Sequence, residues 1–286
     1  MFASTLIETA ATRFAEAGID SATVDAELLI AHALKMSRNE LLTKLVVADF
    51  EIADDDLQAI EKLIARRESR EPLQHLTGIG YFRHLELKVG PGVFVPRPET
   101  EHVAGLAIEQ IKNLHSDAPL VVDLCAGSGA IGLAVATELP HTKVFGVEKS
   151  EDAIEYTRSN YAKLAPHNAQ IILGDIDGCL PNLDGTVDYV IANPPYIPAA
   201  MVPIYPEVAL HDPALALYSG EDGLDLMRVV SRTALRLLRS GGGLTVEHAD
   251  TQGEQVRQLL LDDGWSAVAT FQDFNMRDRA TMATKR

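Results

Sequence analysis

Cysteine is scarce in this sequence, and its two cysteines, Cys125 and Cys179, show no metal-ligand spacing. They cannot form a disulfide framework, and they fit a reducing cytosol, where free cysteine mostly behaves as a small buried hydrophobic residue. Basic residues are also few, because 25 lysines and arginines face 41 acidic residues and leave a formal net charge of −16. A protein that coats nucleic acid needs a basic face to displace counterions, so this charge argues against that class.

Long apolar runs are missing as well. No stretch approaches the roughly 18 residues that span a bilayer. Charged residues between Glu8 and Asp20 interrupt the region where a signal peptide would have its apolar core. The chain of 286 residues is nevertheless 47% hydrophobic, which is ample for a core, excludes disorder and suggests two domains. We expect a cytoplasmic protein with no membrane partner.

Residues 1–72 contain almost no glycine and predict a small helical domain. Leu6 and Phe14 belong to an apolar stripe with helical spacing. Ser37 followed by Glu40 predicts a capping box, in which the two residues satisfy free amides at the start of a helix.

Residues 73–99 are rich in glycine and proline between short β-type runs, and they predict a connector that resembles a β-hairpin. From residue 100 to residue 286, near-continuous apolar strands alternate with helices. That pattern predicts an α/β domain in which helices cover both faces of a parallel sheet. The last two apolar runs, WSAVATFQDF and RATMATKR, predict an antiparallel pair of strands at the sheet's edge.

Gly127, Gly129 and Gly132 form a G-x-G-x-x-G pattern between an expected strand and an expected helix, and Glu148 lies 19 residues after Gly129. This is the dinucleotide fingerprint, with an acid placed to bind ribose hydroxyls, and alone it would suggest a nicotinamide dehydrogenase. S-adenosylmethionine carries the same adenosine without a pyrophosphate. The glycine pattern therefore leaves both ligands open.

Asp123, inside the strand that precedes the glycines, favours S-adenosylmethionine. Its carboxylate would repel the phosphates of a dinucleotide and would suit an amino group and a sulfonium. The alternative is that Asp123 only caps amides of the loop. After the third strand, Asp175 is placed to accept from the adenine amino group, and Ile176 to pack on the ring. The alternative for this pair is an ordinary boundary between a strand and a loop.

The segment Asn193-Pro194-Pro195-Tyr196 directly follows an apolar strand and is the sharpest signal in the chain. Two prolines fix two φ angles and remove two N–H donors, which leaves an array of carbonyl acceptors. A planar –NH₂ group fits such a site, with one N–H donated to the Asn193 side chain and another to the Pro194 carbonyl. Tyr196 offers a ring face to the flat substrate group. We predict Asn193, Pro194 and Tyr196 as catalytic residues and the whole segment as the substrate site.

The sequence resembles the release-factor glutamine methyltransferase family (HemK/PrmC) along essentially its whole length. The resemblance rests on EPLQHLTG, FVPRPETE, DLCAGSG, NPPYIP, GEDGLDLMR and EHADTQGEQV. It implies a seven-stranded, Rossmann-like class I methyltransferase sheet with a small helical N-terminal domain, residues 1–72, that helps to recognise the substrate. It also implies methyl transfer from S-adenosylmethionine, with S-adenosylhomocysteine as product. The acceptor would be the glutamine side-chain nitrogen in the Gly-Gly-Gln motif of class I peptide-chain release factors.

The same resemblance implies roles for individual residues. The cofactor loop would comprise Cys125, Ala126, Gly127, Ser128 and Gly129, with Asp123 before it. Glu148 would bind ribose, Asp175 and Ile176 would contact adenine, and Asn193 would border both cofactor and substrate. Arg97, Glu99 and Thr100 lie in an arm that either faces the cofactor or is purely structural. For Glu207 and Glu247 we favour structural roles over acid–base roles.

Two other functions stay open at this point. Enzymes that methylate an exocyclic amine of a nucleic-acid base share the NPPY segment, because that acceptor is also a flat –NH₂ group. The charge of −16 argues against this alternative. A protein that binds the cofactor without catalysis would have no need for the segment. We expect a monomer that binds release factors, holds no metal and forms no stable complex with nucleic acid.

Overall fold

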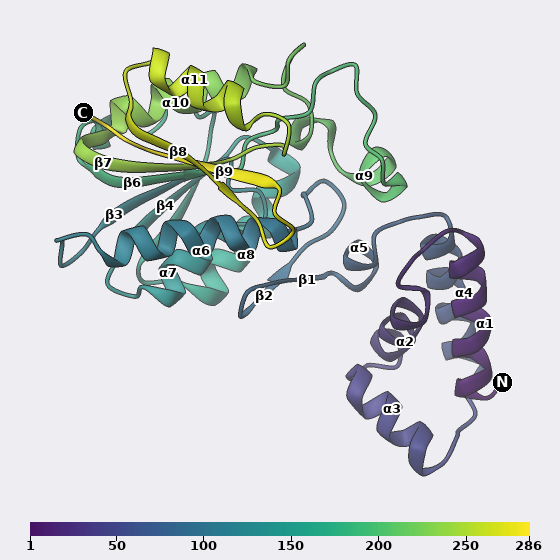
Figure 1. Cartoon of the computed structure of the whole chain (residues 1–286). Helices are drawn as coiled ribbons and strands as arrows, with labels where there is room; N and C mark the ends of the chain where they lie inside the picture. Colours follow the sequence, from purple (N-terminus) through teal and green to yellow (C-terminus); the bar gives the residue numbers. More distant parts are fainter. The chain divides into compact units, whose positions relative to one another are not determined.

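The computed structural model describes residues 1–286 and contains two compact units (Figure 1). The helical unit comprises residues 1–79 together with 203–211, and the α/β unit comprises 80–202 together with 212–286. The helical unit thus extends beyond residue 72, where the sequence predicts its end, and includes a short segment from the predicted methyltransferase domain. No helix has both the length and the apolar character needed to cross a membrane.

The helical unit packs its helices around one apolar core that includes Leu6, Phe14 and Leu29. The predicted capping box is confirmed, since Ser37 accepts from the Glu40 amide and the Glu40 side chain accepts from the Ser37 amide. The helices of this unit are α1 (Ala3–Glu16), α2 (Ala22–Ala33), α3 (Arg38–Val47), α4 (Asp54–Glu68), α5 (Leu73–Thr77) and α9 (Pro206–His211).

Ion pairs to the half-buried Glu207 join α9 to the rest of the helical unit. Arg67 donates to Asp25 at 2.8 Å and to Glu207 at 3.0 Å, and Arg70 donates to Glu207 at 2.6 Å. Burial of Glu207 opposes its ionisation, but the hydrogen bonds from the two arginines outweigh this and lower its pKa. These contacts give Glu207 a structural role, because its carboxylate is held by two arginines.

The α/β unit contains a seven-stranded sheet, as the family resemblance implies, and its strand order is β5-β4-β3-β6-β7-β9-β8. β9 runs antiparallel to both of its neighbours, β7 and β8, so the two C-terminal strands do form an antiparallel pair at the edge. The strands are β3 (Leu120–Leu124), β4 (Lys143–Glu148), β5 (Ala169–Leu173), β6 (Val187–Ala192), β7 (Leu238–Glu247), β8 (Ser266–Gln272) and β9 (Asp278–Thr284). A separate two-stranded hairpin precedes them, with β1 (Ile79–Phe82) and β2 (Leu85–Lys88).

Helices cover both faces of the sheet (Figure 1). One face carries α6 (Pro98–Lys112), α7 (Ala130–Glu138) and α8 (Glu151–Leu164), and the other carries α10 (Asp225–Leu237) and α11 (Gly253–Asp262). Two short 3-10 helices, Pro181–Leu183 and Ala214–Ala216, lie in loops. The strand order reverses between β3 and β6, and open α/β sheets bind ligands at the carboxyl ends of the strands beside such a reversal.

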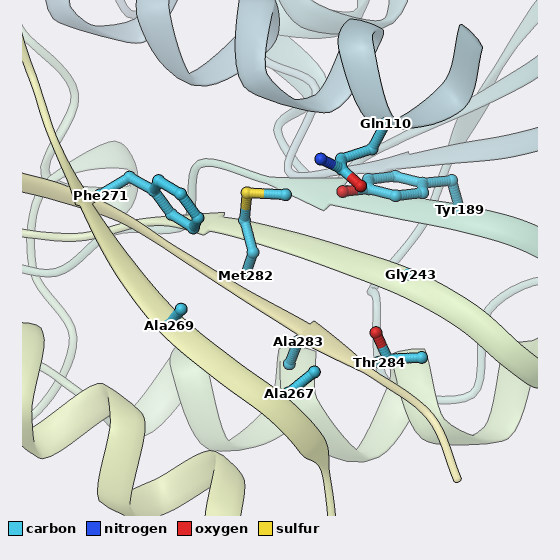
Figure 2. Close-up of a pocket in the computed structure, with 9 residues that line it drawn as sticks. All are labelled: Gln110, Tyr189, Gly243, Ala267, Ala269, Phe271, Met282, Ala283 and Thr284. Atoms are coloured by element: carbon cyan, nitrogen blue, oxygen red, sulfur yellow. The ribbon is translucent and has the colours of Figure 1, made fainter. Parts of the chain in front are cut away.

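A pocket of about 230 Å³ lies away from that edge, and it contains none of the predicted site residues (Figure 2). Figure 2 shows the Gln110 amide beside the Tyr189 ring, with Phe271 and Met282 along the strands. The remaining lining residues are Gly243, Ala267, Ala269, Ala283 and Thr284.

Candidate active site at the carboxyl ends of the strands

The loop between β3 and α7 consists of residues 125–129, the predicted cofactor loop. Cys125, Gly127 and Gly129 have φ angles of 67°, 56° and 86°. At Gly129 a Cβ atom would lie 2.6 Å from a ring carbon of Tyr161, whereas at Gly127 it would meet nothing within 4 Å. Glycine at position 129 is therefore required for packing. The backbone at Gly127 borders open space that a ligand can enter.

Backbone contacts hold this loop against its neighbours. The Ala126 amide donates to the Val147 carbonyl at 2.9 Å. The Asn160 side chain on α8 donates to the Ser128 carbonyl at 2.9 Å. The loop is thus fixed to β4 on one side and to α8 on the other before any ligand binds.

Asp123 lies under this loop, with 1% of its surface exposed. Its Oδ2 atom accepts from the Gly132 amide at 2.8 Å, whereas its Oδ1 atom has no hydrogen-bond partner. Burial raises the pKa of Asp123 to about 7 against the lowering effect of the Gly132 amide, and the charge of Glu148 raises it further. One oxygen therefore accepts from an amide in the first turn of α7, and the other keeps an unused acceptor that suits a cationic group.

Glu148, the last residue of β4, reaches the same loop. Its Oε2 atom accepts from the Gly127 amide at 2.7 Å, and its Oε1 atom accepts from the Ser150 amide at 2.6 Å. The structure therefore brings together Asp123, Glu148 and the glycine loop, as the sequence predicts. Each Glu148 oxygen keeps a further acceptor position with which it could bind a ribose hydroxyl.

Asp175 and Ile176 follow β5 and have separate environments. Asp175 pairs with Lys149 at 2.7 Å, and this hydrogen bond, aided by the Asp177 amide, lowers its pKa. Ile176 is only 4% exposed and packs in a core cluster that includes Leu124 and Val147. Their predicted contact with adenine stays a prediction, and Lys149 is a neighbour that sequence analysis did not consider.

Asn193 begins the loop after β6, a strand whose residues are all buried. Its Nδ2 atom donates to the Thr100 Oγ1 atom on α6 at 3.3 Å. Its Oδ1 atom accepts no hydrogen bond within the protein, and neither does the Pro194 carbonyl. Two acceptors with no internal partner therefore lie on adjacent residues, where the sequence predicts the site of an –NH₂ group.

Tyr196 connects this loop to β7. Its hydroxyl donates to the Glu247 Oε1 atom at 3.4 Å, and its main-chain carbonyl accepts from the Gln252 side chain at 2.9 Å. Burial raises the Tyr196 pKa well above its usual range, and the negative charge of Glu247 adds to this effect, so the phenol stays protonated.

Glu247 is 2% exposed, and its Oε2 atom has no hydrogen-bond partner. Burial raises the pKa of its carboxyl to about 7, although a hydrogen bond from Thr100 and the charge of Arg279 lower it. Sequence reasoning gave Glu247 only a structural role and left that of Thr100 open. The structure places both beside the predicted substrate segment. The remaining member of the arm, Arg97, pairs with Asp212 at 2.6 Å.

The residues present fit S-adenosylmethionine. Gly127 borders open space, Glu148 offers acceptors for hydroxyls, and the buried Oδ1 atom of Asp123 lacks a partner. No group of three or more His, Cys, Asp or Glu side chains is arranged to hold a metal ion.

Comparisons with known proteins agree with this architecture. Residues 115–276 match a methyltransferase domain family. A solved 16S rRNA N2 G1207 methyltransferase from T. thermophilus, in complex with AdoMet and guanosine, superposes with a TM-score of 0.53. The two proteins share 20% sequence identity, and the match covers 73% of this chain and 50% of the solved chain, so the similarity concerns the fold. Fold and site together define a class I, S-adenosylmethionine-dependent methyltransferase.

The remaining matches identify the family within this class of methyltransferases. Residues 5–78 match the PrmC N-terminal domain. A release factor glutamine methyltransferase from Streptomyces coelicolor is 51% identical over 278 residues, which are 96% of this chain and 95% of the relative. The chain belongs to the release factor glutamine methyltransferase family. A second relative, a 4-amino-L-phenylalanine/4-methylamino-L-phenylalanine methyltransferase from Streptomyces pristinaespiralis, is 40% identical to this chain. The match covers 88% of this chain and 84% of that relative.

Proposed function

We propose that this protein methylates the side-chain amide nitrogen of the glutamine in the Gly-Gly-Gln motif of class I peptide-chain release factors, with S-adenosylmethionine as donor. The observation that carries this proposal is the pair of open acceptors, Asn193 Oδ1 and the Pro194 carbonyl, on adjacent residues. A primary amide has two N–H donors on one nitrogen, so it can occupy both acceptors at once.

An amide nitrogen is a poor nucleophile because its lone pair is delocalised into the carbonyl. Acceptors that hold both hydrogens stabilise positive charge as it develops on nitrogen, and each such preorganised contact is worth on the order of 3 kcal/mol. Fixed orientation of the acceptor amide lowers the barrier further, by up to roughly 7–11 kcal/mol in ideal cases. The nitrogen loses one proton as it gains the methyl group, and water can take up that proton.

The donor would be held by the glycine loop, Asp123 and Glu148, with Asp175 and Ile176 on the adenine side and Asn193 next to the transferred group. Bound there, S-adenosylmethionine supplies an electrophilic methyl group. The side chains that orient the acceptor, Asn193 and Tyr196, follow β6, whereas the loop that would hold the donor follows the neighbouring β3. The two halves of the site therefore meet at the reversal in strand order.

Aromatic amines are the competing class of acceptor. The relative from Streptomyces pristinaespiralis is named for a 4-aminophenylalanine substrate, and an aniline nitrogen is also a flat –NH₂ group. An exocyclic amine of a nucleic-acid base has the same geometry, but the net charge of −16 disfavours a polyanionic substrate. We infer that the protein acts in the cytoplasm as a monomer, without stable nucleic-acid binding.

A methyl-transfer assay with labelled S-adenosylmethionine separates these acceptors. The acceptors are a class I release factor, its Gly-Gly-Gln glutamine-to-alanine variant, 4-amino-L-phenylalanine, and duplex DNA with total RNA. We expect label on the intact release factor alone. Label on 4-amino-L-phenylalanine or nucleic acid, with an unlabelled release factor, would contradict the proposed substrate and keep the chemistry of the site.

A further inference from the structure

Three elements bring a polar network to the predicted acceptor site. Strands β6 and β7 are parallel neighbours, with Ala192 opposite Val246, so Asn193 and Glu247 each follow directly at the same edge. The first turn of α6 brings Thr100 to the same place. Thr100 and Glu247 are 4% and 2% exposed, so water has little access to the contacts between them.

The network has a defined direction. Asn193 Nδ2 donates to Thr100 Oγ1 at 3.3 Å, and hydrogen bonding by the Thr100 side chain lowers the pKa of the neighbouring Glu247 carboxyl. The Tyr196 hydroxyl donates to the same carboxyl at 3.4 Å. An ionised carboxylate only accepts, so it requires Thr100 to turn its proton toward Glu247 and to accept from Asn193.

This direction matters because a primary amide has a donor end and an acceptor end of nearly equal size. If Thr100 donated to Asn193 instead, the stable orientation of the amide would be reversed. Nδ2 would then face the substrate, and two donors would oppose each other. The acceptor end faces the substrate only while Thr100 is an acceptor.

We propose that Thr100 and ionised Glu247 are positioning residues, which hold the Asn193 side chain with its Oδ1 atom toward the –NH₂ group of the acceptor. This inference rests on the proposed function, since it assumes that Asn193 binds the amide to be methylated. Neither Thr100 nor Glu247 touches the substrate, and Glu247 acts through Thr100 and Tyr196.

When Glu247 is protonated, Thr100 no longer has to donate to it, because a carboxylic acid can itself donate to the Thr100 hydroxyl. The charged and titratable groups that act on Glu247 are Glu99 on α6, Arg279 on β9 and Tyr196 after β6. Glu99 disfavours the ionised form and Arg279 favours it, while burial has the largest effect and raises the pKa to about 7. Turnover is therefore expected to fall as the pH drops through this value.

The test compares kcat as a function of pH for the wild type, Glu247→Gln and Glu254→Gln, a control on the exposed face of α11. Saturating S-adenosylmethionine and saturating release factor confine the readout to turnover. We expect wild type and Glu254→Gln to lose activity between about pH 8 and pH 6, and Glu247→Gln to show a flat profile with kcat lowered on the order of tenfold or more. A Glu247→Gln enzyme with wild-type kcat and the wild-type profile would overturn the proposal.

Thr100 provides the second test, which also decides the matter if Glu247→Gln does not fold. Thr100→Val keeps the shape and removes the hydroxyl, whereas Thr100→Ser keeps the hydroxyl. We expect Thr100→Val to lose kcat by a similar factor with an unchanged Kd for S-adenosylmethionine, and Thr100→Ser to restore most of it. Equal kcat in the two variants would refute the proposal. A wild type that fails to label the release factor would instead refute the proposed function.

Discussion

The raised pKa of the buried Glu247 carboxyl predicts how the free energy of unfolding changes with pH. Its pKa is raised from 4.5 to about 7, so the folded state binds a proton more tightly than the unfolded state. Stability gained from this proton is present in full below the unfolded pKa and is lost as the pH rises through the folded pKa. Glu247→Gln removes this titration, so the stability difference between wild type and variant changes with pH.

The expected size follows from the pKa itself. Between pH 8.5 and pH 5.5, the wild type should gain about 2 kcal/mol relative to Glu247→Gln, because about 1.5 pH units separate 5.5 from the folded pKa and each unit is worth about 1.4 kcal/mol. The contacts that the glutamine makes in the variant change its stability by the same amount at pH 8.5 and at pH 5.5. They therefore do not affect the difference between the two pH values.

Urea denaturation can measure this difference. The only tryptophan, Trp265, is fully buried in the α/β unit, so its fluorescence reports unfolding of the unit that contains Glu247. Glu254→Gln serves again as the control, and its difference from the wild type should not vary with pH. A pH-independent difference between wild type and Glu247→Gln would show that Glu247 titrates normally. The predicted pH dependence of turnover would then lose its basis.

Three further substitutions test separate parts of the molecule. Asn193→Ala should lower turnover by about two orders of magnitude and leave the Kd for S-adenosylmethionine within several-fold; an unchanged kcat would remove Asn193 from the mechanism. Glu148→Ala should chiefly weaken cofactor binding, and calorimetry that finds an unchanged Kd would show that the ribose assignment is wrong. Glu207→Ala leaves the half-buried Arg70 without its carboxylate partner and should destabilise the helical unit by about 2 kcal/mol, a cost between that for an exposed pair and that for a fully buried one. Faster hydrogen exchange in residues 1–79 would reveal that loss, and unaltered exchange would contradict it.

The sequence predicts those parts of the fold that depend on local pattern. Apolar strands that alternate with helices identify the parallel sheet, and Ser37 with Glu40 identifies the start of α3. The loop residues 125–129 and Glu148 also come together as predicted, because the loop follows β3 and Glu148 is the last residue of β4, the neighbouring strand.

Long-range contacts explain what the sequence does not predict. Thr100 lies 93 positions from Asn193, and Glu247 lies 51 positions from Tyr196, so no spacing pattern relates them. Their proximity depends on the order of β6 and β7 in the sheet and on the path of α6. Similarly, Glu207 joins the helical unit through two arginines about 140 positions earlier, with separations of 140 and 137.

Tandem mass spectrometry of a class I release factor, after incubation with this protein and S-adenosylmethionine, tests the central claim most directly. The account predicts one added methyl group, located on the side-chain nitrogen of the glutamine in the Gly-Gly-Gln motif, and none with the Asn193→Ala variant. A methyl group on any other residue, or an unmodified motif beside an active wild-type enzyme, would contradict it.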